Sequence, residues 1–155
     1  MDKAEAYRQL AEEISSVVAG ETSQIARYAS AACLMALAFK PRFFWTGFYL
    51  VDPLKANELV VGPYQGTLGC LRIPFGKGVC GHVAATRQPI IVPDVHAFPG
   101  HIACDSASNS EIVVPVFYAD GSLAAVLDID STEYDAFDAV DQAGLVEICR
   151  TLLTA

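Results

Sequence analysis

The chain has 155 residues, of which 53% are hydrophobic and 18% are charged. It is therefore long enough for one domain with a substantial core, and too apolar for a disordered chain. Its formal net charge of −8 at pH 7 argues against nucleic acid and anionic membranes as partners, because their phosphates would repel it. No apolar run could span a bilayer and the N-terminus lacks a signal-peptide pattern, so we expect a cytoplasmic protein.

Two helices are expected near the N-terminus. Residues 3–18 follow Asp2, a suitable N-cap, and carry apolar side chains at helical spacing: Tyr7, Leu10, Ile14, Val17 and Val18. Gly20 ends this helix. Residues 22–39 form the second helix before Pro41, with one apolar side made of Ile25, Tyr28, Ala32, Met35 and Phe39.

Strand patterns occupy the middle of the chain. Residues 43–51 (FFWTGFYLV) and 58–61 are rich in strand formers and flank a turn, which indicates an antiparallel hairpin. A loop at 63–69, a strand at 70–73, a short helix at 79–86 and a strand at 89–92 are expected next. Residues 111–118 and 123–129 form a second hairpin across Ala119-Asp120-Gly121-Ser122. Residues 138–153 read as an amphipathic helix with Val140, Leu145, Ile148 and Leu152 available for burial.

This order predicts an α+β fold with a central antiparallel sheet. The N- and C-terminal helices would pack on one face and leave the other face free for a pocket under a long loop. We expect one domain over residues 1–155, with helices in 2–40, the pocket-bearing sheet and loops in 43–131, and a final helix in 138–153.

The long loop, residues 95–110 (VHAFPGHIACDSASNS), is rich in turn formers. An irregular segment of this length inside a compact domain is usually functional or disordered. Phe98, Ile102 and Ala103 give it apolar anchors, which argues against disorder. We interpret it as an active-site loop that leads onto the apolar run 112–116.

The five cysteines fall into two groups. Cys33 and Cys149 lie in apolar helical contexts and are expected to be inert core residues. Cys104 lies in the polar loop, while Cys70 and Cys80 adjoin glycines that would leave their sulfur atoms reachable. One attacking cysteine with one or two resolving cysteines suits sulfoxide or peroxide chemistry, although three buried, unreactive cysteines would give the same spacing. No pair has CxxC spacing, and an odd count without a secretory signal argues against a structural disulfide framework.

The segment GVCGHVAATRQPIIVPDVHAFPGHIACDSASNSEIVVPV, together with FFWTGFYLV, closely resembles the free methionine-(R)-sulfoxide reductase family, whose members are GAF domains. The resemblance covers residues 43–131 and includes three cysteines in matching positions. It implies that Cys104 is the catalytic cysteine, Cys70 the principal resolving cysteine and Cys80 the accessory one. The implied reaction reduces free L-methionine (R)-S-oxide through a cysteine sulfenic acid and a disulfide. A thioredoxin-type donor would then restore the thiols, with no metal and no organic cofactor, and the family implies a homodimer.

Carboxyl groups must accompany such chemistry, because a sulfoxide oxygen leaves only when it is protonated. Strand alternation places Asp128 and Asp130 on one face, which is costly in so apolar a strand unless they meet a ligand or water. Crowded carboxyls raise one another's pKa and so keep a proton near neutral pH. We expect Glu111 and Asp130 first, then Asp128, to hold the sulfoxide oxygen and the substrate amine. Asp130 could equally be a polar residue at the point where the strand ends and a turn begins.

Two aromatic residues and a helix start are further candidates for substrate contacts. Trp45 and Tyr49 share a strand face and could form a wall for the methionine side chain, although such residues also serve simply as core. The turn at residues 77–80 offers backbone N–H groups to a carboxylate.

His96 and His101 lack a clear further ligand beside Cys104, so we expect no metal site and assign them to hydrogen bonds within the loop. A GAF module that binds a small ligand without chemistry, or senses redox state, remains the alternative function. A metal-binding redox sensor is a third possibility.

Overall fold

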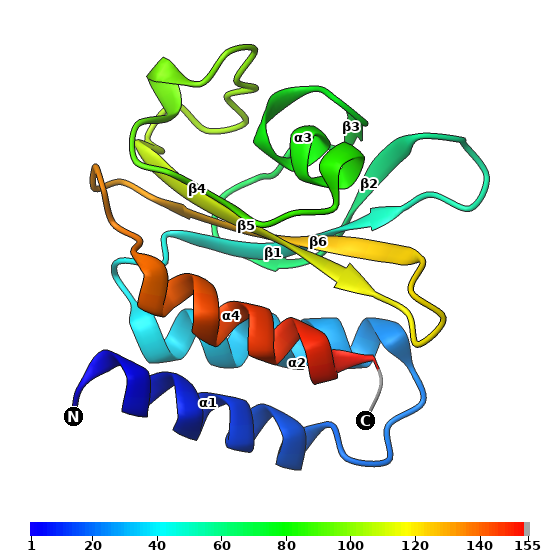
Figure 1. The fold of residues 1–155 in the computed structure, drawn as a ribbon, viewed down its shortest axis with the longest axis vertical. Helices are drawn as coiled ribbons and strands as arrows, with labels where there is room; N and C mark the ends of the chain where they lie inside the picture. Colours follow the sequence, from blue (N-terminus) through cyan, green and yellow to red (C-terminus); the bar gives the residue numbers. More distant parts are fainter. Residues whose placement is uncertain (154–155) are drawn as a thin grey trace.

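The computed structural model describes residues 1–153 as a six-stranded antiparallel sheet with helices on both faces (Figure 1), which confirms the α+β prediction. The strand order is β3-β2-β1-β6-β5-β4. The strands are β1 (Trp45–Val51), β2 (Glu58–Gln65), β3 (Arg72–Pro74), β4 (Ile90–Val92), β5 (Ser110–Phe117) and β6 (Leu123–Ser131). The last two residues of the predicted domain, 154–155, lie outside the described residues.

Three helices cover one face of the sheet, as predicted (Figure 1). They are α1 (Lys3–Val17), α2 (Gln24–Phe39) and α4 (Ala139–Leu152). In this layer α2 packs on β1 and β2, α4 packs on β5, and α1 packs against α2 and α4. The opposite face carries α3 (Gly78–Thr86), a 3-10 turn (Val95–Ala97) and the long loop. None of the helices in the described part of the chain is long and apolar enough to cross a membrane.

The buried stripes of the helices differ from the prediction at three residues. Val17, Ile25 and Val140, which were expected on the buried sides, are 56%, 54% and 39% exposed. On α1 the stripe continues from Ile14 to Val18 instead of Val17, one helical turn later. On α4 the stripe begins at Asp141, a polar residue that the apolar pattern could not reveal.

The strand that follows the first turn is longer than predicted. Residues 63–65, expected in a loop, belong to β2, and β3 begins at Arg72 instead of residue 70. The register shifts between Gly47 and Tyr49, which pair with Tyr64 and Val61. Pro63 therefore lies in a bulge, where its missing N–H costs no ladder hydrogen bond.

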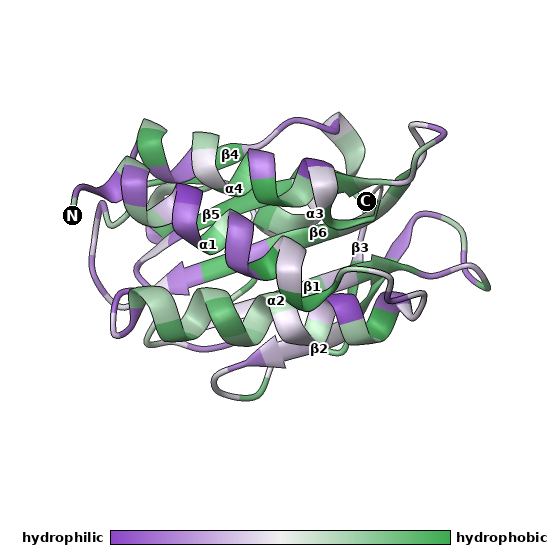
Figure 2. Ribbon diagram, turned by 90° about the horizontal axis from the view of Figure 1, so that it is seen from below, coloured by the Kyte–Doolittle hydropathy of each residue, from purple (hydrophilic) through white to green (hydrophobic). Residues whose placement is uncertain are grey.

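Alternation along the strands gives the sheet two buried faces with different chemistry. On β6, Leu127 and Ile129 enter the core under α2 and α4, while Val126 and Asp128 face the other side. Figure 2, viewed from the helical side, shows β5 and β6 as hydrophobic for most of their length, with hydrophilic residues along α1. The predicted pocket therefore lies on the sheet face opposite the three helices, where a second cluster of buried residues surrounds it.

A buried carboxylate ties the helical layer together. Asp141 has no exposed surface and accepts hydrogen bonds from Tyr7 (2.6 Å), Arg42 (2.9 Å) and Lys3 (3.0 Å). It also accepts the backbone N–H of Asp138, which closes a capping box at the start of α4. One side chain thus joins α1, α4 and the segment that leads into β1.

We predict that Asp141→Ala lowers the free energy of unfolding by about 1–3 kcal/mol, because it leaves the buried Tyr7 hydroxyl without its partner and removes the anion shared by the half-buried Lys3 and Arg42. Denaturant unfolding monitored by circular dichroism measures the change. Glu147→Ala is the matched control on the same helix, since its pair with Arg150 is exposed and contributes little. Equal effects of the two substitutions would contradict this account of Asp141.

Candidate functional site

A pocket lies between the second face of the sheet, the start of α3 and the long loop. Its lining includes seven of the eight residues selected from the sequence: Trp45, Tyr49, Cys80, Cys104, Glu111, Asp128 and Asp130. The eighth, Cys70, is joined to Cys104 by a disulfide. The cavity is small, about 40 Å³, which is room for a few water molecules. The candidate residues, which are spread over positions 45–130 of the sequence, therefore lie together at one pocket.

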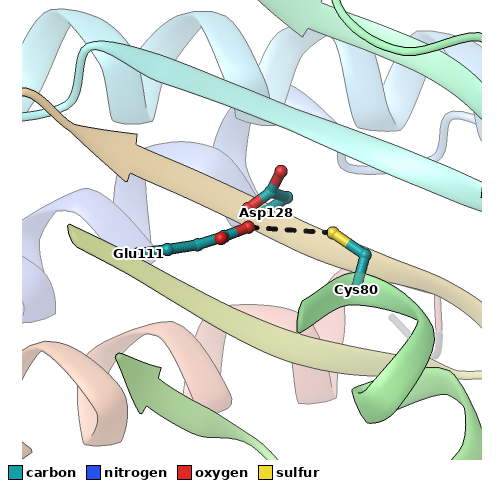
Figure 3. A group of neighbouring side chains, drawn as sticks. All are labelled: Cys80, Glu111 and Asp128. Atoms are coloured by element: carbon teal, nitrogen blue, oxygen red, sulfur yellow. Dashed lines mark hydrogen bonds between the residues drawn. The ribbon is translucent and has the colours of Figure 1, made fainter. Parts of the chain in front are cut away.

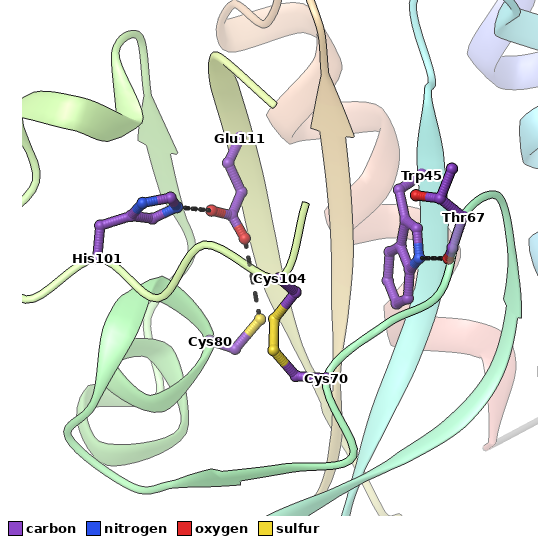
Figure 4. Close-up of a disulfide and its surroundings, with 7 residues drawn as sticks. All are labelled: Trp45, Thr67, Cys70, Cys80, His101, Cys104 and Glu111. Atoms are coloured by element: carbon purple, nitrogen blue, oxygen red, sulfur yellow. Dashed lines mark hydrogen bonds and ion pairs between the residues drawn. A yellow bond between two sulfur atoms is a disulfide. The ribbon is translucent and has the colours of Figure 1, made fainter. Parts of the chain in front are cut away.

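The disulfide between Cys70 and Cys104 lies at this pocket (Figure 4). It joins the segment before β3 to the long loop, with a Cα–Cα distance of 5.3 Å. Cys104 is exposed and Cys70 is half-buried, so solvent can reach the bond. The two cysteines that the family resemblance pairs are thus covalently linked here.

One hydrogen bond joins the same pair of segments, and another fixes the segment before β3 to β1. The indole N–H of Trp45 donates to the carbonyl of Thr67 at 2.8 Å, and the Thr67 hydroxyl donates to Asp105 at 2.6 Å. The Thr67 hydrogen bond lowers the pKa of the Asp105 carboxyl, together with the backbone N–H of Ala107. The residue after Cys104 is therefore fixed to the segment that carries Cys70.

Cys80 is not part of the disulfide, and the prediction that its sulfur is reachable is wrong. It is only 4% exposed, because α3 packs closely on the turn before it. A side chain at Gly81 would place its Cβ 2.4 Å from the carbonyl of Pro74, so this glycine serves close packing. Burial raises the pKa of the Cys80 thiol, and the charges of Asp128 and Glu111 raise it further. This thiol is poorly suited to act as the attacking group.

The three carboxyl groups meet because neighbouring strands place them in register. Asp130 on β6 pairs with Glu111 on β5 and with Trp45 on β1, so these residues form one row across the sheet. Asp128 lies two residues along β6 on the same face. Glu111 and Asp128 are each 5% exposed, and Asp130 is half-buried.

Burial has a large effect on the protonation of this cluster. It raises the pKa of Glu111 and of Asp130 well above the usual values, and the Asp128 charge adds to both shifts. Burial also raises the pKa of Asp128, but interactions with Glu111 and Cys80 oppose that shift. Asp128 is therefore the first of the three to ionise, while Glu111 and Asp130 hold protons at higher pH.

The aromatic residues form a stacked wall beside the carboxyls. The Trp45 ring stacks on Tyr49 at 5.6 Å and on Tyr64 at 5.0 Å between centroids. A Cβ at Gly69 would lie 2.9 Å from the Trp45 ring, so only glycine fits between this ring and the disulfide segment. Trp45 and Tyr49 thus belong to the core and also line the pocket.

Sequence reasoning missed the position of His101. Its Nε2 lies 3.9 Å from Glu111 Oε1, inside the pocket, instead of bonding within the loop as expected (Figure 4). Burial lowers the pKa of His101, so the ring is mainly neutral at pH 7. His96 does bond within the loop, to Asn109 at 3.0 Å. No periodic pattern marks a loop histidine, and its place three residues before Cys104 was the available signal.

The remaining expectations are met in part. Cys149 is buried as predicted, but Cys33 is only half-buried and lies at the surface of α2. Phe98 and Ile102 pack against the pocket-side core and anchor the loop, whereas Ala103 is exposed. Lys77, Gly78 and Val79 at the start of α3 line the pocket, where backbone N–H groups were expected.

Comparison with known proteins gives a consistent family. The sequence profile described as GAF domain matches residues 12–155. The chain is 43% identical to the free methionine-R-sulfoxide reductase of Escherichia coli (strain K12) over 98% of this chain and 89% of that protein. It is 39% identical to the Saccharomyces cerevisiae protein of the same name, over 98% of this chain and 86% of that protein.

A solved structure is similar over nearly the whole chain. It is the X-ray structure of the free methionine-R-sulfoxide reductase of Neisseria meningitidis in complex with its substrate. The TM-score is 0.92 with 49% sequence identity, covering 98% of this chain and 89% of that chain.

The protonation of Glu111 predicts a distinctive dependence of stability on pH. Its pKa is higher in the folded state than in the unfolded chain, so its ionisation destabilises the fold as the pH rises above about 4. Glu111→Gln should therefore match the wild type near pH 4 and exceed its melting temperature increasingly toward neutral pH. Asp120→Asn is the control of opposite sign, since Ser122 lowers the pKa of that exposed carboxyl. A melting-temperature difference for Glu111→Gln that does not change with pH would contradict the raised pKa.

Proposed function

This chain belongs to the GAF domain family, and we propose that it is an oxidoreductase that reduces free L-methionine (R)-S-oxide to L-methionine. The observation that carries the proposal is the Cys70–Cys104 disulfide at a pocket lined by buried carboxyl groups with a raised pKa. The names of relatives at 39% and 43% identity over nearly the full chain support it. A thiol pair would supply the two electrons, and an acid beside it would protonate the sulfoxide oxygen.

In the proposed first step, the Cys104 thiolate attacks the sulfoxide sulfur. Two electrons pass from the cysteine sulfur to the substrate sulfur, and one proton is taken up. The oxygen ends on Cys104 as a sulfenic acid, and methionine is released as a neutral thioether. The exposed position of Cys104 in the long loop suits it to this role, while the buried, protonated Cys80 does not.

Glu111 and Asp130 are the proposed sources of that proton. Burial raises the pKa of each well above its usual value, so each keeps its proton to a higher pH than an ordinary carboxyl group does. General acid catalysis is most effective when the donor's pKa lies near the working pH. Asp128 ionises first and is the proposed partner of the substrate amine.

The proposed second step is resolution of the sulfenic acid by Cys70. Its thiol attacks the Cys104 sulfur, a disulfide forms, and the oxygen leaves as water. A dithiol reductant of the thioredoxin type then exchanges with the exposed disulfide and restores both thiols. The electron balance of this cycle requires neither a metal nor an organic cofactor.

The shape of the site favours a free amino acid over a peptide. The stacked Trp45 and Tyr49 rings offer an apolar wall to the methionine methyl group. The start of α3 offers backbone N–H groups to the substrate carboxylate. Because the cavity holds only about 40 Å³ in the disulfide form, we propose that the loop opens after reduction to admit substrate.

We predict turnover of free methionine (R)-sulfoxide by the reduced protein with a thioredoxin system, measured as methionine formed. The (S)-epimer and a peptide-bound sulfoxide should be reduced at background rates, since the acid and the amine site fix one orientation of a free amino acid. Cys104→Ser should abolish turnover yet keep substrate affinity, whereas Cys33→Ser, far from the pocket, should retain activity. Binding without turnover by folded, reduced wild-type protein would favour the non-catalytic GAF module.

A second prediction isolates the resolving step. Cys70→Ser should release one equivalent of methionine per protein and then stop, because the sulfenic acid on Cys104 lacks its resolving thiol. Mass spectrometry after treatment with a sulfenic acid-specific reagent should locate one adduct on Cys104. Cys80→Ser, which leaves the redox pair intact, should give multiple turnovers and little adduct. An adduct on Cys80 would contradict the assigned roles.

A further inference from the structure

Figure 3 shows a cluster of three donor side chains, none of which belongs to the disulfide. The Cys80 sulfur, one Glu111 oxygen and one Asp128 oxygen all lie within 4.8 Å of one another. Cys80 Sγ lies 4.0 Å from Glu111 Oε2. Each residue is at least 95% buried, and each comes from a different element: α3, β5 and β6. The sheet and α3 therefore position these three donors, none of which lies in the long loop.

One donor in this cluster lacks a partner. Among the described residues, Asp128 Oδ1 is buried and has no hydrogen-bond partner. A buried polar atom of this kind normally has a partner, because an unpaired one destabilises the fold. Its carboxylate belongs to the cluster with Cys80 and Glu111, so the missing partner is expected at this cluster.

We propose that Cys80, Glu111 and Asp128 form a binding site for a divalent metal ion of the zinc class, and that the bound ion inhibits the enzyme. One thiolate and two carboxylate oxygens are ligands that Zn²⁺ accepts, at about 2.0–2.3 Å. Tetrahedral ligands at those distances lie roughly 3.5 Å apart. The Cys80–Glu111 separation of 4.0 Å therefore needs to contract by about 0.5 Å to bind the ion, and no separation in the cluster by more than about 1.3 Å.

The surroundings match a site with three protein ligands and one open position. The open position would face the cavity, whose volume of about 40 Å³ suits an ion and water but not an amino acid. His101 Nε2 faces Glu111 Oε1 at 3.9 Å and can orient that carboxylate. Binding releases the thiol proton and any carboxyl proton to solvent, and no electrons move.

The metal ion would inhibit because it and the substrate use the same side chains, and this step rests on the proposed function. An ion held by Glu111 and Asp128 occupies the groups that the substrate oxygen and amine would need. Cys70 and Cys104 are not ligands, so the ion can bind while they are joined as a disulfide. Metal binding and catalysis can therefore be tested separately.

The direct test uses Co²⁺ as a spectroscopic probe on the disulfide form under anaerobic conditions. Because Cys70 and Cys104 are then unavailable, a thiolate-to-cobalt absorption band reports one of the three remaining cysteines. We expect one equivalent of Co²⁺, displaced by one equivalent of Zn²⁺. Cys80→Ser should remove the band and weaken binding by at least about 100-fold, since even a group that only orients a ligand is worth roughly 10- to 100-fold.

Matched controls make the result decisive. Cys33→Ser and Cys149→Ser should keep the band, and circular dichroism should verify that each variant is folded. Should Cys80→Ser not fold, Asp128→Asn provides the alternative and should weaken Co²⁺ binding to a similar extent. A band that persists in Cys80→Ser, or no band in the wild type, overturns the proposal.

An activity measurement completes the test. Zn²⁺ should raise the apparent KM for methionine (R)-sulfoxide with little change in kcat, and a chelator should reverse the effect. Zn²⁺ that binds at Cys80 without changing the KM would overturn the inhibitory role. Absence of any turnover would instead overturn the proposed function, while the cobalt spectrum would still decide the metal site.

Discussion

Burial of carboxyl groups against an apolar sheet face is the constraint on which this pocket depends. Glu111 and Asp128 lie on two adjacent strands whose opposite faces bury Ile112, Leu127 and Ile129 in the helical core. The strands cannot rotate to expose the carboxyls without exposing those apolar residues. Packing of the apolar face against the helices therefore holds the carboxyls in an environment that favours their protonated forms. The acid groups of the pocket depend on this packing.

The same burial separates the cysteines by chemistry. Cys80 is fixed on α3 among carboxyls that disfavour its thiolate, whereas Cys104 lies on an exposed loop and is joined to Cys70. The proposed redox exchange thus involves the exposed edge of the site, while the buried part of the site holds a thiol whose pKa is raised. The pocket thus contains an exposed pair of linked cysteines and, separately, a buried thiol among carboxyl groups.

The loop that carries Cys104 is anchored from several sides. Asn109 accepts a hydrogen bond from His96 through its Oδ1 and donates through its Nδ2 to the carbonyl of Thr132, while Ser110 donates to the carbonyl of Glu133. At its other end, the Thr67–Asp105 hydrogen bond and the disulfide attach it to the segment before β3. Reduction removes the covalent attachment alone, so the hydrogen-bonded base of the loop can serve as the hinge of an opening movement.

The sequence determined the helices, the hairpins and the face that Asp128 and Asp130 share, because helical spacing, turn residues and strand alternation are local properties. The family resemblance selected the cysteines. Other features depended on contacts between segments remote in the chain. Strand register placed Glu111 beside Asp130, packing of α3 buried Cys80, and the return of the long loop brought His101 to the pocket. Only the tertiary structure decided these, because burial and pairing between strands have no periodic signature in the sequence.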